Sequence, residues 1–124
     1  FPGGWAGDQV NAFTGTGLTD KQKQAQEYIR KVLNWRKTNS TVQFGELKHF
    51  APENGIYVYF RYDKSGKVMV VLNKNTSEKS LDTSRFSEVM ANGTSGKEII
   101  SGNTIADLKN LKVPASSAMI IELK

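Results

Sequence analysis

Apolar residues recur at helical spacing between residues 19 and 38. They lie three or four positions apart, so they share one face of a helix while charged residues cover the other. Thr19 and Gln22 have the spacing of a capping box at the start of this helix, and the short polar side chains of residues 38–40 predict its end. The predicted apolar stripe consists of Ala25, Tyr28, Ile29, Val32 and Leu33.

After residue 41 the apolar pattern changes to the period of a strand. Residues 56–62 alternate, with Tyr57 and Tyr59 facing away from the aliphatic side chains. The segment 63–66 predicts a tight turn into a returning strand over 67–73. Shorter strands are expected at residues 44–50, 80–82, 98–101 and 118–123. Short strands at this spacing are typical of an antiparallel sandwich or barrel.

The first 17 residues follow neither period. Glycines separate the aromatic residues Phe1, Trp5 and Phe13, which predicts a loop whose aromatic side chains pack on something outside it. The chain starts with Phe1 rather than Met, and it has neither the basic nor the apolar region of a signal peptide. We therefore expect a piece of a longer parent protein, with any targeting signal and any catalytic residue on the sequence before it.

The composition fits one small globular core. Of 124 residues 38% are hydrophobic, and 17 Lys+Arg against 12 Asp+Glu give a net charge of 17 − 12 = +5. The absence of cysteine excludes disulfides, cysteine-bound metals and thiol nucleophiles. The longest apolar run, residues 68–72, is too short to span a membrane.

Candidate catalytic residues are few. The acidic residues are scattered through turns and polar faces, so no carboxylate pair is predicted for acid-base chemistry. His49 is the only histidine, which excludes a histidine metal cluster, and its strand position favours a packed or exposed side chain over a catalytic base. Asp8 stands out because it follows the glycine-rich loop. No metal and no cofactor are predicted.

An aromatic strand face leaves several binding functions open. Tyr57, Tyr59 and Arg61 could stack nucleic-acid bases, but the lysines are dispersed over the whole chain, which disfavours nucleic-acid binding. Packing of this face on the helix or on a neighbouring domain is the simpler interpretation. A carbohydrate-binding patch also stays open, with Tyr57, Tyr59 or Trp35 as the stacking platform.

Four segments carry a resemblance to a known family. FPGGWAGDQVNAFTG, LTDKQKQAQEYIRKVLNWRK, VQFGELKHFAPENGIYVYFRY and KVMVVLNKN resemble, in this order, the C-terminal end of α-amylase family glycoside hydrolases of the cyclomaltodextrinase and neopullulanase branch. One departure is Ala6, where the family more often has proline. The resemblance implies that residues 1–40 are the last loop and helix of a (β/α)8 barrel. Residues 41–124 would form a mainly β domain, an antiparallel Greek-key β-sandwich like the amylase C-terminal domain.

The resemblance also implies a function. The family's catalytic carboxylates lie upstream, so this piece is expected to be a non-catalytic domain that stabilises the barrel of a retaining hydrolase of maltodextrin, cyclodextrin or pullulan. A glucan-binding module is the alternative. Trp5 could stack on substrate sugars, and Asp8 could accept hydrogen bonds from their hydroxyl groups. The alternatives are buried packing for Trp5 and loop capping for Asp8.

The resemblance implies partners and a location as well. The expected partners are the upstream barrel of the same chain and, through the parent, α-glucan oligosaccharides. A homodimer through the exposed helix face is a further option, since the apolar stripe has no barrel strand within this sequence to cover it. The expected location is periplasmic, with the cytoplasm as the alternative.

Overall fold

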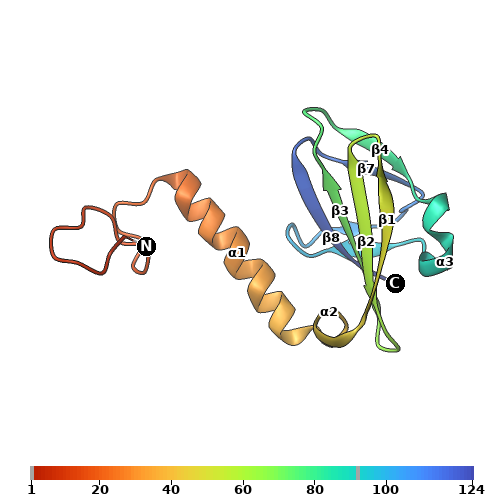
Figure 1. Cartoon of the computed structure of the whole chain (residues 1–124), viewed down its shortest axis with the longest axis horizontal. Coiled ribbons are helices and arrows are strands. Elements are labelled where there is room, and N and C mark those ends of the chain that lie inside the picture. Colours follow the sequence, from red (N-terminus) through yellow and green to blue (C-terminus); the bar gives the residue numbers. More distant parts are fainter. Residues whose placement is uncertain (1, 92) are drawn as a thin grey trace. The chain divides into compact units, whose positions relative to one another are not determined.

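The computed structural model describes residues 2–91 and 93–124. The chain divides into two compact units, residues 1–34 and 35–124. Figure 1 labels most of the helices and strands. Among the described residues, no helix combines the length and the apolar character needed to cross a bilayer. The domain boundary predicted after residue 40 stays a prediction.

The helix α1 (Asp20–Thr38) begins where the capping box predicts. The Thr19 N–H donates to Gln22 Oε1 over 2.9 Å, and the Gln22 N–H donates to Thr19 Oγ1 over 3.3 Å. Each residue therefore satisfies a backbone donor that the first helical turn leaves unpaired. The predicted start and end of this helix are both confirmed.

A second short helix, α2 (Ser40–Phe44), was not predicted. Asn39 caps it, because its side-chain oxygen accepts the Val42 N–H over 3.0 Å. The strand expected at residues 44–50 therefore begins only at Glu46, after Gly45. The polar residues that end α1 thus also start the next helix.

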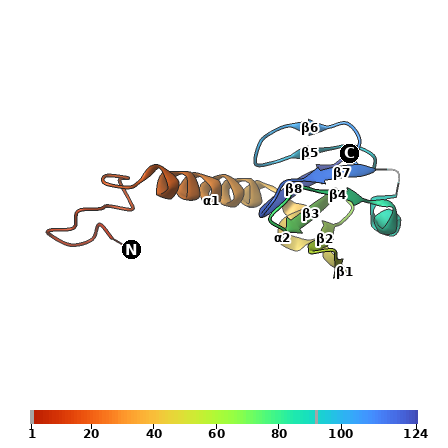
Figure 2. The ribbon, with the colours of Figure 1, turned by 90° about the horizontal axis from the view of Figure 1, so that it is seen from above.

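The strands of the second unit form two antiparallel sheets. The larger sheet has six strands in the order β1-β2-β3-β8-β5-β6, and β4 pairs with β7 in a second sheet. Seen from above in Figure 2, the strands of the larger sheet follow one another from β6 at the top to β1 at the bottom. The strands are β1 (Glu46–Glu53), β2 (Ile56–Tyr62), β3 (Lys67–Asn73), β4 (Lys79–Asp82), β5 (Gly96–Glu98), β6 (Thr104–Ile105), β7 (Asn110–Val113) and β8 (Ser117–Leu123).

The core lies between the two sheets. Phe60, Met69 and Ile121 from the larger sheet are fully buried, and they share one cluster with Leu111 and Val113 of β7. Two short helices, η1 (Ser84–Phe86) and α3 (Ser87–Met90), add apolar side chains to the same cluster. The predicted antiparallel β-sandwich is therefore confirmed, and its strand order is compatible with the Greek key.

The prediction of a strand over 98–101 was wrong. β5 ends at Glu98, and the chain then turns around the Glu98 side chain. The strand starts earlier, at Gly96, where a Cβ atom would lie 2.6 Å from the Ile121 side chain and 2.7 Å from the Glu122 carbonyl oxygen. This close approach to β8 requires glycine.

Candidate functional site

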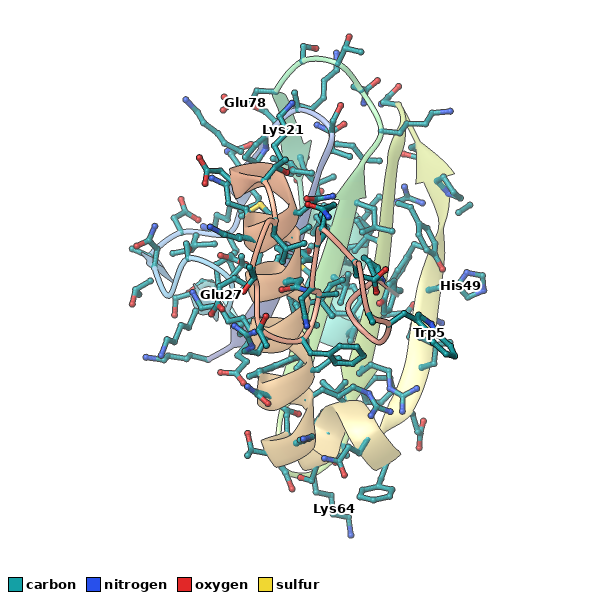
Figure 3. The ribbon with its side chains drawn as sticks, turned by 90° about the vertical axis from the view of Figure 1, so that its left-hand side faces the viewer. Trp5, Lys21, Glu27, His49, Lys64 and Glu78 are labelled. Carbon is teal, nitrogen blue, oxygen red and sulfur yellow. The ribbon has the colours of Figure 1, made fainter. Side chains whose placement is uncertain are left out.

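No catalytic constellation is visible in the part of the chain that the structure describes. Within residues 2–91 and 93–124, no group of three or more His, Asp or Glu side chains is placed to hold a metal ion. His49 is exposed on β1 and projects away from the strand (Figure 3). Its ring meets the ring of Tyr57 edge-on, with centroids 6.2 Å apart. His49 is thus an exposed strand residue, one of the two alternatives that its strand position favours.

The glycine-rich loop of the first unit is held together by its own hydrogen bonds. Asn11 Oδ1 accepts the N–H groups of Phe13 and Thr14 over 2.9 and 3.0 Å, and Asn11 Nδ2 donates to the Gly3 carbonyl over 3.2 Å. At Gly3, φ is +111° and a Cβ atom would lie 2.5 Å from Asn11 Cγ. The loop therefore depends on glycine at this position.

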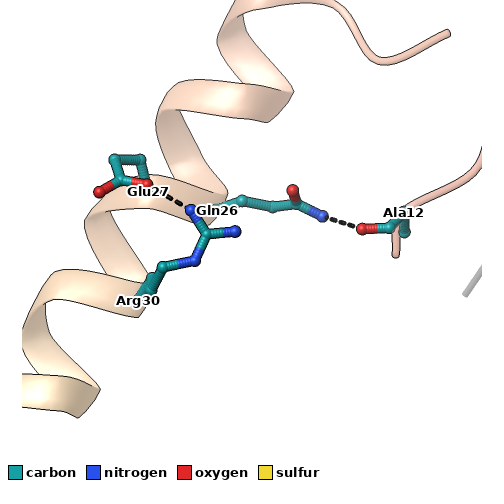
Figure 4. Close-up of polar contacts among 4 residues, drawn as sticks. All are labelled: Ala12, Gln26, Glu27 and Arg30. Atoms are coloured by element: carbon teal, nitrogen blue, oxygen red, sulfur yellow. Dashed lines mark hydrogen bonds and ion pairs between the residues drawn. The ribbon is translucent and has the colours of Figure 1, made fainter. Parts of the chain in front are cut away.

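The loop is also fastened to the helix that follows it. Gln26 Nε2 of α1 donates to the Ala12 carbonyl over 2.8 Å (Figure 4). The next residue, Glu27, forms an exposed ion pair with Arg30, which lies about one turn further along α1. The loop and the first turns of α1 therefore form one hydrogen-bonded unit.

Asp8 closes the turn that carries Trp5. Its Oδ2 accepts the N–H of Gly3 over 2.7 Å and the N–H of Trp5 over 3.2 Å. These hydrogen bonds, the one from Gly3 foremost, hold the pKa of the Asp8 carboxyl below its ordinary value. The indole of Trp5 is 84% exposed. The structure thus gives Asp8 the loop-capping contacts, while Trp5 has no packing of its own inside the loop.

The outer face of the larger sheet is its face turned away from the core. Side chains alternate along a strand, so the neighbours of buried Phe60, Met69 and Ile121 point to this face. The strand register arranges them in three rows across the sheet. The rows are Leu47–Arg61–Val68–Glu122, His49–Tyr59–Val70–Ile120 and Tyr57–Leu72–Ala118.

Much of this outer face is aromatic or aliphatic. The rings of Tyr57 and Tyr59 lie 5.8 Å apart and are tilted by 38° to one another. On β3, the Val70 side chain is 8% exposed, whereas the Leu72 side chain is 39% exposed. Burial raises the pKa of the Tyr59 hydroxyl above its ordinary value, which agrees with a partly dehydrated surface.

Trp35 meets one corner of the outer face. Its Nε1–H donates to Glu122 Oε1 over 2.6 Å, and Asn39 Nδ2 donates to the same oxygen over 3.0 Å. The end of α1 and the residue after it are therefore bonded to β8. Trp35, which the sequence analysis gave as an alternative stacking residue to Tyr57 or Tyr59, is thus bonded to the row of Glu122, whereas Tyr57 and Tyr59 belong to the other two rows.

Arg61 has a donor without an acceptor. Its Nε is buried, and no hydrogen-bond partner is found for it in the described residues. In the register, Arg61 lies between Leu47 and Val68, neither of which offers a side-chain acceptor. A buried unpaired N–H is unfavourable and calls for a structural explanation.

A cavity of about 530 Å³ opens between the edges of the two sheets. Phe50, Leu81 and Phe86 are among its apolar lining residues. The guanidinium of Arg85 lies 6.0 Å from the Phe50 ring centre and 5.4 Å from that of Phe86, and it pairs with Glu53 over 2.9 Å. Arg85 and Glu53, two charged residues that line the cavity, are thus already paired with one another.

Glu98 is a buried acid that sequence reasoning missed. It is 6% exposed, and its carboxylate accepts hydrogen bonds from Ser101 and from the backbone of Ile100. Burial raises the pKa of Glu98, but these hydrogen bonds outweigh burial and bring it below the ordinary value. Since its oxygens accept hydrogen bonds from backbone donors, the role of Glu98 is to hold the turn after β5.

A protein-family comparison identifies the domain. Residues 47–122 match the family model described as the cyclo-malto-dextrinase C-terminal domain. The match starts in β1 and ends in β8, so it includes both sheets. The chain belongs to the cyclo-malto-dextrinase C-terminal domain family. The resemblance to the C-terminal end of α-amylase family enzymes is thereby confirmed.

Solved structures share the fold of this cyclo-malto-dextrinase C-terminal domain. A crystal structure of AmyP in complex with maltose has a TM-score of 0.73 at 11% identity, over 87% of this chain and 22% of that one. An α-amylase from Geobacillus thermoleovorans complexed with acarbose has a TM-score of 0.65 at 13% identity, over 86% of this chain and 24% of that one. The trehalulose synthase MutB from Pseudomonas mesoacidophila MX-45 has a TM-score of 0.63 at 16% identity, over 97% of this chain and 24% of that one. The chain thus spans about a quarter or less of their lengths.

The residues predicted to bind substrate and the aromatic strand residues belong to different units. Trp5 and Asp8 lie in the first unit, whereas Tyr57, Tyr59 and Trp35 belong to the second. The Trp5 loop in the first unit and the outer face of the larger sheet in the second unit are therefore two candidate surfaces, and only the outer face belongs to the family domain. The hydrogen bonds of Glu98 to Ile100 and Ser101 are local, but no hydrophobic period marks them. The missing acceptor of Arg61 Nε likewise has no periodic signal in the sequence.

Proposed function

We propose that this chain is the non-catalytic C-terminal part of an α-amylase family glycoside hydrolase that acts on α-glucans such as maltodextrin, cyclodextrin or pullulan. The observation that carries the proposal is the family match over residues 47–122, from β1 to β8. The solved relatives are about four times longer than this chain, which supports a longer parent. In this proposal the parent supplies the catalytic carboxylates, and this domain stabilises the parent's barrel.

The apolar stripe of α1 supports a barrel origin for the first unit. Tyr28, Ile29 and Leu33 are 41%, 56% and 51% exposed, although they lie on one helical face. The outer helices of a (β/α)8 barrel cover its strands with such a face. We therefore assign residues 1–40 to the last loop and helix of the barrel. A homodimer through this stripe and a periplasmic location stay predictions.

The Trp5 loop fits a position beside the substrate. Active sites of (β/α)8 barrels lie on the face where the strands end, and a loop after the last strand belongs to that face. An exposed indole on a hydrogen-bonded loop can stack on a sugar ring without a large loss of conformational entropy. In this proposal Trp5 contacts the glucan, and the Asp8 carboxylate holds the turn that presents it.

Substitutions in the parent test this role of the loop. Trp5→Ala is expected to raise KM for maltoheptaose, whereas Phe13→Ala removes another exposed aromatic side chain from the same loop and should leave KM unchanged. Equal kinetics for the two variants would remove Trp5 from the substrate-binding site.

Deletion of residues 41–124 from the parent tests the stabilising role of the β domain. The truncated parent is expected to melt at a lower temperature than the intact parent. Below that temperature it should still hydrolyse β-cyclodextrin, since the catalytic carboxylates remain. An unchanged melting temperature together with weaker binding to glucan would instead favour the glucan-binding module, for which the neighbouring rings of Tyr57 and Tyr59 are the supporting observation.

A further inference from the structure

We propose that the cavity between the edges of the two sheets binds α-glucan oligosaccharides. This inference rests on the proposed function, because that function makes α-glucan the class of ligand that the parent handles. It adds a binding site in the β domain itself and names the side chains that hold the sugar.

The cavity has the size of a small-molecule site. Its volume is about 530 Å³, and ligand pockets commonly have roughly 300–1,000 Å³. Its lining residues come from β1, β2 and the turn between them, from β4 and from η1. All of these elements lie in the second unit, so the sandwich alone forms the cavity.

The most buried residues of the lining are apolar. Ile56, Val58 and Phe86 are buried, and Phe50 and Leu81 are half-buried. The rings of Phe50 and Phe86 meet edge-on, with centroids 4.8 Å apart. A sugar ring carries C–H groups on its faces, and burying them against these side chains removes apolar surface from water.

The more exposed residues of the lining are polar and include both donors and acceptors. The side chains of Asn54 and Ser80 make no hydrogen bond within residues 2–91 and 93–124. Asp82 Oδ1 accepts the Ser84 N–H over 2.9 Å, and a carboxylate has acceptor positions left after one such bond. An amide, a hydroxyl and a carboxylate together match the hydroxyl groups of a sugar, each of which both donates and accepts.

The charges of the lining favour a neutral ligand. Lys79 and Arg85 balance Glu53 and Asp82, and Arg85 pairs with Glu53 over 2.9 Å. An ionic ligand would therefore gain little net attraction. The Arg85 guanidinium still has N–H donors and the Glu53 carboxylate still has acceptor positions beyond this pair. The pair can thus bind two neighbouring sugar hydroxyls, donating to one and accepting from the other.

The outer face of the larger sheet is less suited to a sugar chain than the cavity. Small-molecule sites are concave, and an open sheet face is not. The rings of Tyr57 and Tyr59 are tilted by 38° to one another, so they do not form one flat platform. The cavity instead combines an apolar part with donors and acceptors around it.

Titration of the 124-residue chain with maltoheptaose, followed by NMR, tests the proposal. The side-chain signals of Asn54, Leu81 and Arg85 should shift and approach saturation at about 10 mM sugar, which corresponds to a dissociation constant of about 1 mM. The methyl signals of Leu72 are the control, because Leu72 is exposed on the outer face, and they should not shift. Inorganic phosphate at the same concentration should leave all of these signals in place, because the charges of the lining balance.

Matched asparagine variants test the contact with the sugar. Asn54 has a φ of +51°, which glycine adopts readily, so Asn54→Gly removes the amide and keeps the turn. It should weaken maltoheptaose binding about five-fold, the effect of one lost hydrogen bond. Asn103→Gly makes the same change at an exposed asparagine outside the lining and should leave the affinity unchanged. Equal affinities of the two variants would overturn the assignment of Asn54 to the site.

The remaining outcomes also decide. Shifts of the Leu72 signals alone would assign glucan to the outer face, and shifts of the Trp5 indole signal alone would assign it to the glycine-rich loop. A response of the cavity signals to phosphate but not to maltoheptaose would assign the cavity to an ionic ligand. Each of these results, or no shift at all, would overturn the proposed site.

Hydrolysis of β-cyclodextrin by the intact parent is measured separately. Its absence would refute the proposed function, whatever the chain binds. Hydrolysis by a parent whose 124-residue chain shows no response of the cavity signals would refute only the glucan site in the cavity.

Discussion

Replacing Glu98 by glutamine removes one charge from the domain and keeps the size of the side chain. Glu98 Oε1 accepts the Ile100 N–H over 3.0 Å, and Oε2 accepts both the N–H and the Oγ–H of Ser101 over 2.6 Å. The amide nitrogen of glutamine cannot accept a hydrogen bond. Whichever way the amide turns, one set of these donors therefore loses its acceptor.

The expected loss of stability follows from the number of hydrogen-bond donors that lose their acceptor. One unpaired buried donor and the loss of charge on the remaining hydrogen bonds cost about 2 kcal/mol of unfolding free energy. For a domain of this size, that corresponds to a melting temperature lower by roughly 10 °C. Glu88→Gln is the matched control, because Glu88 is an exposed residue whose partner is the exposed Lys48, and its effect should stay within about 0.5 kcal/mol.

The pH dependence of unfolding gives an independent test. The pKa of folded Glu98 lies below its ordinary value of 4.5, so its carboxylate stabilises the fold above the unfolded pKa, and this stability is lost as pH falls through the folded pKa. The difference between wild type and Glu98→Gln should therefore be constant near neutral pH and shrink in acid. A Glu98→Gln variant as stable as wild type in urea unfolding at pH 7 would refute the reasoning.

Three further changes have expected outcomes. Phe60→Ala empties a fully buried site between the sheets and should lower the unfolding free energy by about 3–5 kcal/mol in urea, whereas Phe44→Ala, at a side chain 82% exposed, should not. Gly3→Ala should abolish hydrogen-exchange protection of the Thr14 amide, while Gly4→Ala, whose Cβ meets nothing within 4 Å, should preserve it; equal protection would contradict the described loop. Acidification through the lowered pKa of Asp8 should change Trp5 fluorescence, and Asp8→Asn should remove that pH dependence.

The longest elements of the fold were readable from the sequence. The strands over 56–62 and 67–73 were predicted with the bounds that the structure has. Alternation marks the first strand, and Asp63 specifies the turn because its Oδ1 accepts the N–H groups of Ser65 and Gly66. Local patterns and local hydrogen bonds are sufficient for such a hairpin.

Two features could not be predicted from the sequence: the shortest strands, and which face of the larger sheet is turned to the core. β6 and β7 have two and four residues, which is too short for a clear period, and β7 pairs with the distant strand β4. In β3 the side chains on both faces are apolar. Val68 and Val70 on the outer face are almost as buried as Met69 and Val71 on the core face. Periodicity therefore could not tell the core face from the outer face.

The candidate site was predictable only in part. Asp8 and Trp5 could be found because an acid and an aromatic residue stand out in a glycine-rich loop. That Asp8 caps the turn at Gly3 became visible only from its hydrogen bonds. That the buried Nε of Arg61 lacks an acceptor became visible only from the structure, because hydrophobic periodicity does not show which polar groups surround a guanidinium.

Incubation of the intact parent and of the 124-residue chain with β-cyclodextrin and maltoheptaose tests the central claim most directly. The account predicts that the parent releases reducing sugar and that the chain alone releases none, although circular dichroism shows it folded. Hydrolysis by the isolated chain would contradict a non-catalytic domain. A parent that leaves both substrates intact would contradict its assignment to an α-glucan hydrolase.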